Sequence, residues 1–184
     1  MYRERTDDIR GLFPEPPVLA GGRICLKPLS LQDAEDLHRL MGQEEVYRYL
    51  PTFLFEKKYA GPEDVISRLY SGELTESMIL GIYMEERFRG LMEVYSYRAP
   101  LRKASTGYRL LREEWGKGIA TEALRIMTGE LLTGRGIEII TASTMLKNRA
   151  SAHVLEKNGF TLVNHAVEED WGFPEATLTD KWIR

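Results

Sequence analysis

A short apolar strand that runs through a glycine-rich turn directly into an amphipathic helix constrains this chain more than any other feature. The segment covers residues 108–123 and reads Tyr-Arg-Leu-Leu-Arg-Glu-Glu-Trp-Gly-Lys-Gly-Ile-Ala-Thr-Glu-Ala. Such a turn points several backbone N–H groups at one place, at the positive end of the helix dipole. Gly116 and Gly118 have no Cβ, so an anion can approach the backbone closely. The segment therefore predicts a site for a phosphate or a pyrophosphate.

Two well-known phosphate-binding patterns fit this turn poorly. A dinucleotide fingerprint requires a third glycine, and Thr121 occupies that position. A Walker loop requires Ser or Thr after its lysine, but Gly118 follows Lys117, and no glycine lies five positions before Gly116. A nucleotide-binding enzyme is therefore disfavoured. On this segment alone, a helix start that binds no ligand remains an alternative.

The six residues from Trp115 to Ala120 resemble the acyl-CoA signature of the GNAT superfamily of N-acetyltransferases, which is usually Gln/Arg-x-x-Gly-x-Gly/Ala. Gly118 and Ala120 match this signature, whereas Trp115 departs from the common Gln or Arg. The run Trp-Gly-Lys-Gly followed by Ala-Thr-Glu-Ala is similar to the RimJ/RimL branch, the ribosomal-protein N-terminal acetyltransferases and their relatives.

A second motif supports the same resemblance. Residues 148–160 read as a short helix that Asn148 can cap and that Asn158 and Gly159 can end. In the RimJ/RimL branch, an Asn-x-x-Ser sequence followed by Leu-Glu-Lys-x-Gly-Phe is the second hallmark, and residues 148–160 carry both parts. The resemblance extends more weakly to residues 23–45 and covers most of the chain after residue 22.

The resemblance implies an α/β fold with a mixed, mostly antiparallel seven-stranded sheet flanked by about four helices. The apolar patterns agree with that order of elements. We expect strands at 23–28, 77–85, 88–97, 105–111, 137–144, 160–167 and 177–183, and the main helices at 34–41, 62–72, 119–131 and 148–158. Residues 1–22 are charged and then proline-rich, which predicts an N-terminal arm, and residues 23–184 are expected to form a single domain.

Composition agrees with one cytoplasmic domain. The chain has 184 residues, 43% of them apolar, and a net charge of −3 from 25 basic and 28 acidic side chains. This balance gives no electrostatic reason to expect nucleic acid as a partner. No apolar run approaches the roughly 20 residues of a membrane span, and the charged N-terminus lacks the apolar core of a signal peptide. The three histidines show no metal-binding spacing, so we expect no metal.

Acetyl-CoA is the cosubstrate that the resemblance implies. Backbone amides of the turn would hold its pyrophosphate, and the edge of the preceding strand would pair with the pantetheine arm. A backbone N–H near Leu110 would stabilise the oxyanion. The expected cofactor-binding residues are Leu110, Leu111, Trp115, Gly116, Lys117, Gly118, Ile119, Ala120, Thr121, Asn148 and Ser151.

The leaving thiolate requires a proton or a hydrogen bond. Many GNAT enzymes use a tyrosine seven residues after the asparagine, but Leu155 stands there. The RimJ/RimL branch has a serine three residues after the asparagine, which is Ser151, close to the helix N-terminus where a thiolate is stabilised. The alternative is that Ser151 only completes the first helical turn. Asn148 has the same ambiguity, because it can cap the helix or bind the pantetheine.

The general base is less determined. Glu93 lies in a strand rich in apolar and aromatic residues, and burial there would raise its pKa, which suits a base. The alternative is an ordinary solvent-facing residue of an alternating strand. We therefore take Ser151 and Glu93 as the candidate catalytic residues.

These features predict an N-acetyltransferase that moves an acetyl group from acetyl-CoA to a primary amine, by direct attack on the thioester. The acceptor could be a protein N-terminus or a small molecule, and its groove would be formed by the loops 47–61, 97–103 and 168–175. A CoA-binding regulatory or sensor module without turnover is the alternative. The chain is expected to be a monomer or a homodimer, and the aromatic residues Phe53, Phe55 and Trp171 could serve an interface or the acceptor site.

Overall fold

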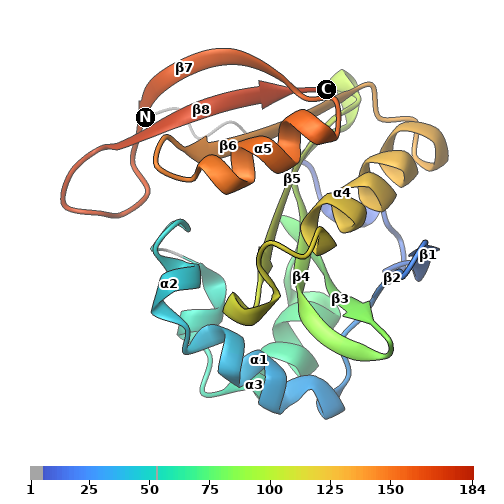
Figure 1. Cartoon of the computed structure of the whole chain (residues 1–184). Helices are drawn as coiled ribbons and strands as arrows, with labels where there is room; N and C mark the ends of the chain where they lie inside the picture. The colour runs from blue at the N-terminus through green and yellow to red at the C-terminus, as the bar shows by residue number, and fades with distance from the viewer. Residues whose placement is uncertain (1–5, 53) are drawn as a thin grey trace.

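The computed structural model of the protein describes residues 6–52 and 54–184. Within these ranges, eight strands form one sheet in the order β1-β2-β3-β4-β5-β6-β8-β7 (Figure 1). The strands are β1 (Leu19–Gly21), β2 (Ile24–Lys27), β3 (Ser77–Met84), β4 (Arg87–Arg98), β5 (Lys103–Leu110), β6 (Ile139–Met145), β7 (Thr161–Glu169) and β8 (Thr177–Ile183). All neighbours are antiparallel except β5 and β6. The predicted mixed, mostly antiparallel sheet is confirmed, with one strand more than the seven expected.

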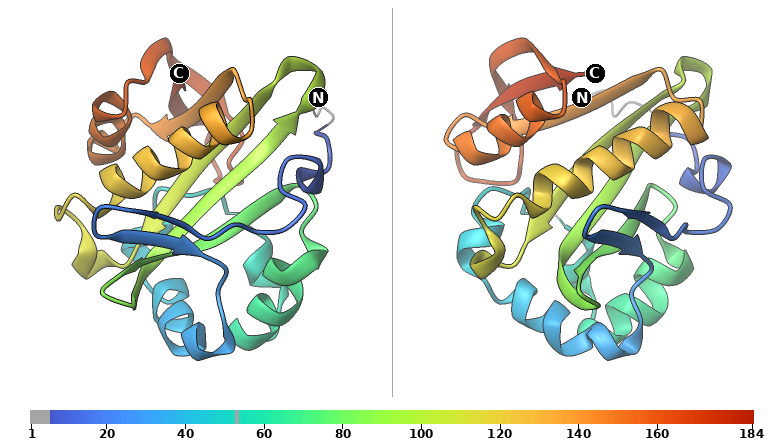
Figure 2. Two further views of the ribbon diagram at one scale, coloured as in Figure 1. Left: turned by 90° about the vertical axis from the view of Figure 1, so that its right-hand side faces the viewer. Right: turned by 45° about the vertical axis from the view of Figure 1, so that its right-hand side comes forward.

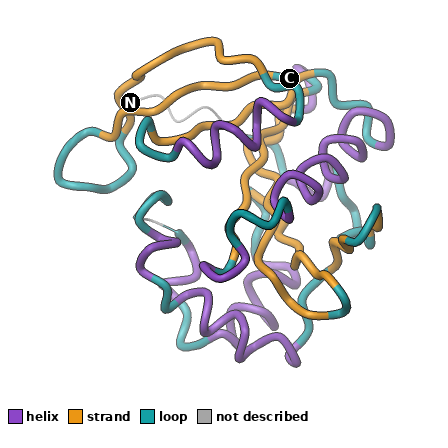
Figure 3. The backbone as a smooth tube through the Cα atoms, viewed as in Figure 1, coloured by secondary structure: helices purple, strands orange, loops and turns teal. Residues whose placement is uncertain are grey.

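The described residues also contain five α-helices, where about four were expected: α1 (Ala34–Met41), α2 (Glu44–Tyr47), α3 (Pro62–Asp64), α4 (Ile119–Gly129) and α5 (Arg149–Lys157). Two of these helices continue with wider π-helical turns, α3 over Val65–Glu73 and α4 over Glu130–Gly134. In Figure 3 the helices lie below and beside the strands, and β7 and β8 form the upper edge of the view. None of the described helices is long and apolar enough to cross a membrane.

Apolar side chains on the two faces of the sheet form separate cores. The α4 core contains Leu124 and Met127 of α4, packed with Leu80, Met92 and Ile140 of the sheet. The α1 core contains Leu37 and Leu40 of α1, packed with Leu69, Ile79 and Leu91. Successive strand residues point to opposite faces, and β3 and β4 each supply neighbouring residues to different cores. The two cores therefore lie on opposite sides of one sheet. Figure 2 shows the backbone of the strands and helices from two further directions.

The eighth strand, β1, lies in the segment that the sequence predicts to be an arm. It is only three residues long and pairs with β2 through a turn at Gly22, whose φ is +58°. Further upstream, Ile9, Leu12 and Phe13 are buried in the α4 core. A strand of three residues, Leu-Ala-Gly, is too short to show an alternating pattern of polar and apolar residues. Its formation depends on pairing with the neighbouring strand. These residues are therefore part of the sheet and of the core.

The feature that positions the site is the divergence of β5 from β6. Their parallel ladder comprises Lys103–Ile139, Ala104–Ile140 and Ser105–Thr141. After these pairs, β5 continues beside β4, whereas β6 continues beside β8 as far as Met145. In Figure 1, β6, β8 and β7 run off to the upper left while β5 descends. We call the space between residues 106–110 of β5 and 142–145 of β6 the β5–β6 opening.

The burial of the N-terminal segment gives a first prediction. Phe13 is 3% exposed, and the guanidinium of Arg135 lies 4.7 Å from its ring centroid. Phe13→Ala should lower the free energy of unfolding by about 3–5 kcal/mol, because it removes a packed aromatic side chain. Urea denaturation followed by circular dichroism measures this change. Val18→Ala, at a position that is 68% exposed, should change it by less than about 0.5 kcal/mol. Equal effects at both positions would contradict the assigned core.

Candidate active site

The edge of β5 that faces the β5–β6 opening offers backbone groups to a ligand. In the ladder with β4, the Leu111 N–H donates to the Arg89 carbonyl at 3.0 Å. Antiparallel pairing alternates, so every second residue of β5 directs its backbone groups at β4, and the residues between them point away from β4. The N–H groups of Tyr108 and Leu110 therefore face the opening. Of the two strand residues expected to contact the cofactor, Leu110 points its N–H to the opening and Leu111 uses its N–H in the sheet.

The glycine turn at the end of β5 has the geometry of an anion site. Gly116 and Gly118 have φ values of +75° and +78°, in the left-handed region that favours glycine. Gly118 is the N-cap of α4, and its carbonyl accepts the first helical hydrogen bond from Glu122 N–H at 3.1 Å. The N–H groups of the first helical turn have no acceptor within the helix. They belong to the predicted residues Ile119, Ala120 and Thr121.

Side chains from three parts of the chain hold this turn. Arg23 donates to the Lys117 carbonyl at 2.6 Å and to Glu122 at 2.8 Å. Glu114, which is buried, pairs with Arg89 at 2.6 Å and with the Lys117 ammonium at 3.1 Å. Burial alone would raise the pKa of Glu114, but these two cations lower it, so the carboxylate stays ionised. The Lys117 ammonium is therefore engaged with a carboxylate, and this residue offers the turn its backbone.

Trp115, at the first signature position, connects the turn to β5. Its indole N–H donates to the Leu110 carbonyl at 3.1 Å. The Arg112 guanidinium lies 4.6 Å from the centroid of the Trp115 ring. The indole thus occupies the one carbonyl of β5 that lies next to the turn. This leaves the Leu110 N–H as the nearest donor that faces the opening.

The second predicted motif lies across the opening, at the N-terminus of α5. Asn148 caps this helix, and its Oδ1 accepts a hydrogen bond from the Ser151 N–H at 3.2 Å. The Tyr108 hydroxyl, which comes from β5, donates to Ser151 Oγ at 3.2 Å. Burial raises the pKa of Tyr108 to about 12, so the phenol keeps its proton at neutral pH. The structure therefore brings Ser151 to β5, through a tyrosine that the sequence analysis did not select.

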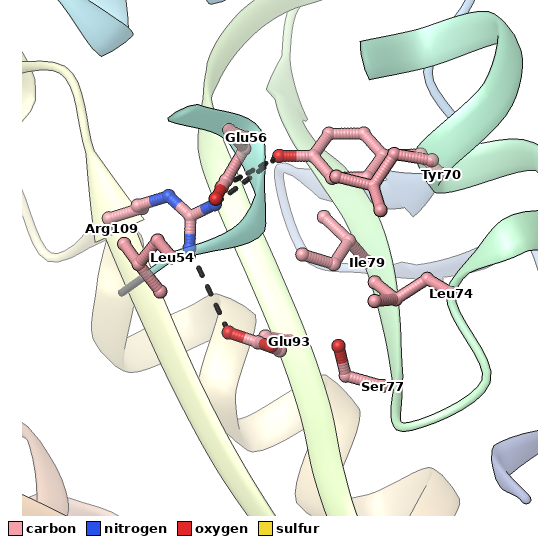
Figure 4. A pocket seen from close by; sticks show the side chains of 9 residues that line it. Leu54, Glu56, Tyr70, Leu74, Ser77, Ile79, Glu93 and Arg109 are labelled. Atoms are coloured by element: carbon pink, nitrogen blue, oxygen red, sulfur yellow. Dashed lines mark hydrogen bonds and ion pairs between the residues drawn. The ribbon is translucent and has the colours of Figure 1, made fainter. Parts of the chain in front are cut away.

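Glu93 lies on the other face of the sheet, in a polar cluster next to the α1 core (Figure 4). The Arg109 guanidinium lies 3.8 Å from the Glu93 carboxylate and forms a close ion pair with Glu56. Tyr70 donates to Glu56 at 2.9 Å, and Arg109 donates to the Tyr70 oxygen at 3.3 Å. The cavity between these groups is about 10 Å³, which holds one water molecule at most.

The environment of Glu93 shifts its proton affinity upward. Burial raises the pKa of Glu93, and a hydrogen bond with Ser77 opposes this shift. Gly107 of β5 lies directly opposite Glu93 in the ladder, and directly opposed residues point to the same face. Because Gly107 has no side chain, no side chain of β5 separates Glu93 from the β5–β6 opening at that level. The structure thus shows Glu93 as a carboxyl with a raised pKa, opposite a residue of β5 that has no side chain.

The loops expected to form the acceptor groove divide into two groups. Thr52 N–H donates to the Trp171 carbonyl at 2.8 Å, which joins the loop 47–61 to the loop 168–175 at the wide end of the opening. The loop 97–103 lies at the other end of β5, where the Asp7 carboxylate accepts from Ala99 N–H at 2.7 Å. Phe53 lies outside the described residues, as does the side chain of Phe55.

Three site residues escaped the sequence analysis. Tyr108 and Arg109 directly precede Leu110 in β5, and their position in the strand that leads into the glycine turn was the signal available for them. Glu56 lies in a loop between helices, where nothing local separates it from other surface glutamates. Among residues 6–52 and 54–184, no group of three or more His, Cys, Asp or Glu side chains could hold a metal ion.

Comparison with known sequences identifies relatives of this chain. A family model described as the acetyltransferase (GNAT) domain matches residues 23–161. The probable N-acetyltransferase YjcK of Bacillus subtilis (strain 168) is 29% identical over 150 residues, which cover 78% of this chain and 83% of the relative. The uncharacterized N-acetyltransferase YoaA of the same strain is 25% identical over 160 residues, which cover 78% and 82%.

Solved structures share the fold. Spermidine N-acetyltransferase from Vibrio cholerae, in complex with CoA and spermine, has a TM-score of 0.73 at 19% identity, covering 89% of this chain and 96% of that chain. RimJ from Mycobacterium smegmatis, in complex with CoA-disulfide, has a TM-score of 0.73 at 22% identity, covering 90% and 87%. A GNAT-family acetyltransferase from Bacillus anthracis has a TM-score of 0.77 at 16% identity, covering 91% and 98%.

The buried ion pair beneath the sheet leads to a second prediction. Glu56 and Arg109 are 3% and 5% exposed. Glu56→Ala leaves the Arg109 guanidinium buried beside Glu93 alone, so the free energy of unfolding should fall by about 3–5 kcal/mol. Glu138→Ala removes the partner of Arg102 in an exposed pair and should cost less than about 1 kcal/mol. Thermal and urea denaturation of both variants measure the difference, and a loss at position 56 no larger than that at 138 would refute it.

Proposed function

This chain belongs to the acetyltransferase (GNAT) family, and we propose that it transfers the acetyl group of acetyl-CoA directly to a primary amine. As an N-acetyltransferase of this family it uses acetyl-CoA as its cosubstrate. The observation that carries the direct mechanism is the β5–β6 opening. It joins an unpaired strand edge, a glycine turn at a helix N-terminus and the hydroxyl of Ser151, and Glu93 lies on the other face of the same strands.

We assign the cofactor to the turn and to the strand edge. The free N–H groups of Ile119, Ala120 and Thr121 suit the pyrophosphate, since anions bind where helix N–H groups converge. The amide-rich pantetheine arm can pair with the β5 edge in the way that a strand would. This places the thioester carbonyl close to the N–H groups of Leu110 and Tyr108. Asn148 and Ser151 would meet the sulfur end of the arm from α5.

In the proposed reaction the amine nitrogen attacks the thioester carbonyl carbon, and an oxyanion forms on its oxygen. The Leu110 N–H stabilises that oxyanion, which typically contributes about 2.7–4 kcal/mol to lowering the barrier. The C–S bond then breaks and the sulfur leaves as a thiolate, which accepts a hydrogen bond from Ser151. Glu93 takes the proton that the nitrogen loses, through one water molecule, because the cavity beside Glu93 is too small for an amine.

Two classes of acceptor remain for this site, a protein N-terminal amine and a small-molecule amine. The polar cluster below the sheet contains two carboxylates, Glu56 and Glu93, against the single guanidinium of Arg109. Its charge is therefore negative when Glu93 is ionised, which favours an acceptor that arrives as a cation. Both classes satisfy that condition. A non-catalytic CoA-binding sensor is the alternative, and it predicts acetyl-CoA binding without turnover on any amine.

The glycine turn provides the test of cofactor binding. Calorimetric titration should show that the protein binds acetyl-CoA and does not bind ATP or NAD. Gly118→Ala should weaken acetyl-CoA binding about 5- to 30-fold, because the free turn would relax out of the left-handed conformation and binding would have to restore it at a cost of roughly 1–2 kcal/mol. The added Cβ would also lie 3.4 Å from the Arg23 guanidinium.

Gly129→Ala is the matched control for this titration. Gly129 is also in α4, with an ordinary helical φ of −59°, and an added Cβ meets nothing within 4 Å. Acetyl-CoA affinity should stay unchanged in this variant. If Gly118→Ala bound acetyl-CoA as tightly as Gly129→Ala, the turn would not be the cofactor site.

The base is tested by the pH dependence of kcat/KM. Burial raises the pKa of Glu93 above the 4.5 of an ordinary glutamate, so kcat/KM should fall as the pH drops through this raised value and protonates the base. Glu93→Gln should lower kcat/KM about 10²- to 10⁴-fold and remove that acidic limb, while acetyl-CoA binding is retained. Glu35→Gln, at an exposed position on α1, should leave both kcat/KM and its pH profile unchanged. A Glu93→Gln enzyme with an intact acidic limb would exclude Glu93 as the base.

A further inference from the structure

The hydrogen bond between Tyr108 and Ser151 joins two elements that meet only at the divergence of the sheet. Tyr108 comes from β5, and Ser151 lies in the first turn of α5, which follows β6 (Figure 1). The Tyr108 hydroxyl donates to Ser151 Oγ at 3.2 Å. We propose that Tyr108 is a positioning residue that orients and polarises the Ser151 hydroxyl toward the leaving sulfur. This inference rests on the role of Ser151 proposed above.

The direction of this hydrogen bond decides what Ser151 can do. A hydroxyl has one hydrogen and two lone pairs. Because Oγ accepts from Tyr108, and the Ser151 backbone N–H is held by Asn148 Oδ1 at 3.2 Å, the Ser151 hydrogen is free to point at a third group. The β5–β6 opening lies between the two elements, so a sulfur placed there is the group that this hydrogen would reach. One lone pair of Ser151 Oγ and the Ser151 backbone N–H are thus both engaged before any ligand arrives.

Tyr108 supports Ser151 without giving up its own proton. Burial raises the pKa of the phenol to about 12, so Tyr108 remains protonated over the pH range of an assay. A donor that stays protonated draws electron density from Oγ and strengthens the bond that Ser151 donates, since hydrogen bonds in a chain polarise one another. In this arrangement no proton leaves Tyr108. The thiolate is stabilised by Ser151 and takes its proton from solvent afterwards.

Other polar groups near Ser151 do not offer the same contact. His153 is two residues further on, and its Nδ1 lies 3.5 Å from the Glu156 carboxylate. Leu155, at the position where many relatives carry a tyrosine, is 3% exposed and packs in the α4 core. α5 thus carries no tyrosine at position 155, and the tyrosine hydroxyl near Ser151 comes from Tyr108 of β5, on the opposite side of the opening.

A double-mutant cycle on kcat tests this inference. Tyr108→Phe keeps the ring and removes the hydroxyl. It should lower kcat about 2- to 12-fold, the equivalent of one hydrogen bond, with the KM for acetyl-CoA within about twofold of wild type. In the Ser151→Ala background the same change should have no further effect on kcat, because the group that Tyr108 acts upon is gone. Tyr83→Phe, in β3, is the control, because its ring packs in the α1 core away from Ser151, and its kcat should equal that of wild type.

Each result of the cycle has one meaning. The inference is confirmed if Ser151→Ala lowers kcat and if adding Tyr108→Phe to that variant lowers kcat no further. If the losses of the two single variants multiply in the double variant, Tyr108 acts independently of Ser151 and the inference is wrong. If Tyr108→Phe alone leaves kcat unchanged, the inference is also wrong. Should Ser151→Ala have wild-type kcat, the role proposed for Ser151 fails as well, which the Glu93→Gln profile distinguishes from a failure of the whole mechanism.

Discussion

The site depends on a deficit of backbone hydrogen bonding in β5. Parallel pairing with β6 ends after three residue pairs, yet β5 continues for five more residues beside β4. Buried or half-buried backbone N–H and C=O groups need partners, and the Trp115 indole supplies one for the Leu110 carbonyl. The amides that remain form a template for a ligand that itself carries amides. The divergence of the two strands thus specifies a type of ligand before any side chain is considered.

The alternation of side chains along β5 then separates the two kinds of proton chemistry. Tyr108 packs against the α4 core and meets Ser151, whereas its neighbour Arg109 points to the opposite face and meets Glu93 and Glu56. In the proposed reaction, the group that would stabilise the leaving sulfur and the group that would accept the proton of the nitrogen are therefore held apart by the thickness of a sheet. Each group can keep its own electrostatic environment, and neither environment has to change during the proposed reaction.

The sequence predicted those parts of the site that arise from local structure. The glycine turn and the capped helix at Asn148 depend on residues close together in the chain, and both lie where expected. β1 was missed because a three-residue strand forms only against its neighbour. The Tyr108–Ser151 contact joins residues 43 positions apart, and the Arg109–Glu56 pair joins residues 53 positions apart. Such contacts depend on tertiary packing, and no pattern in a single strand or loop encodes them.

Arg23 gives the glycine turn a property that reaches beyond its shape. It lies just before β2, and its guanidinium donates hydrogen bonds to the Lys117 carbonyl in the turn and to the Glu122 carboxylate in α4. The loss of conformational entropy needed to order a loop around a flexible, highly charged cofactor is therefore incurred when the protein folds. The turn is held by Arg23 before the cofactor arrives, and a ligand that binds only the folded turn stabilises it, so the affinity for acetyl-CoA and the stability of the first hairpin are thermodynamically linked. Saturating the cofactor site should then protect the amide hydrogens of β1 and β2 from exchange with solvent.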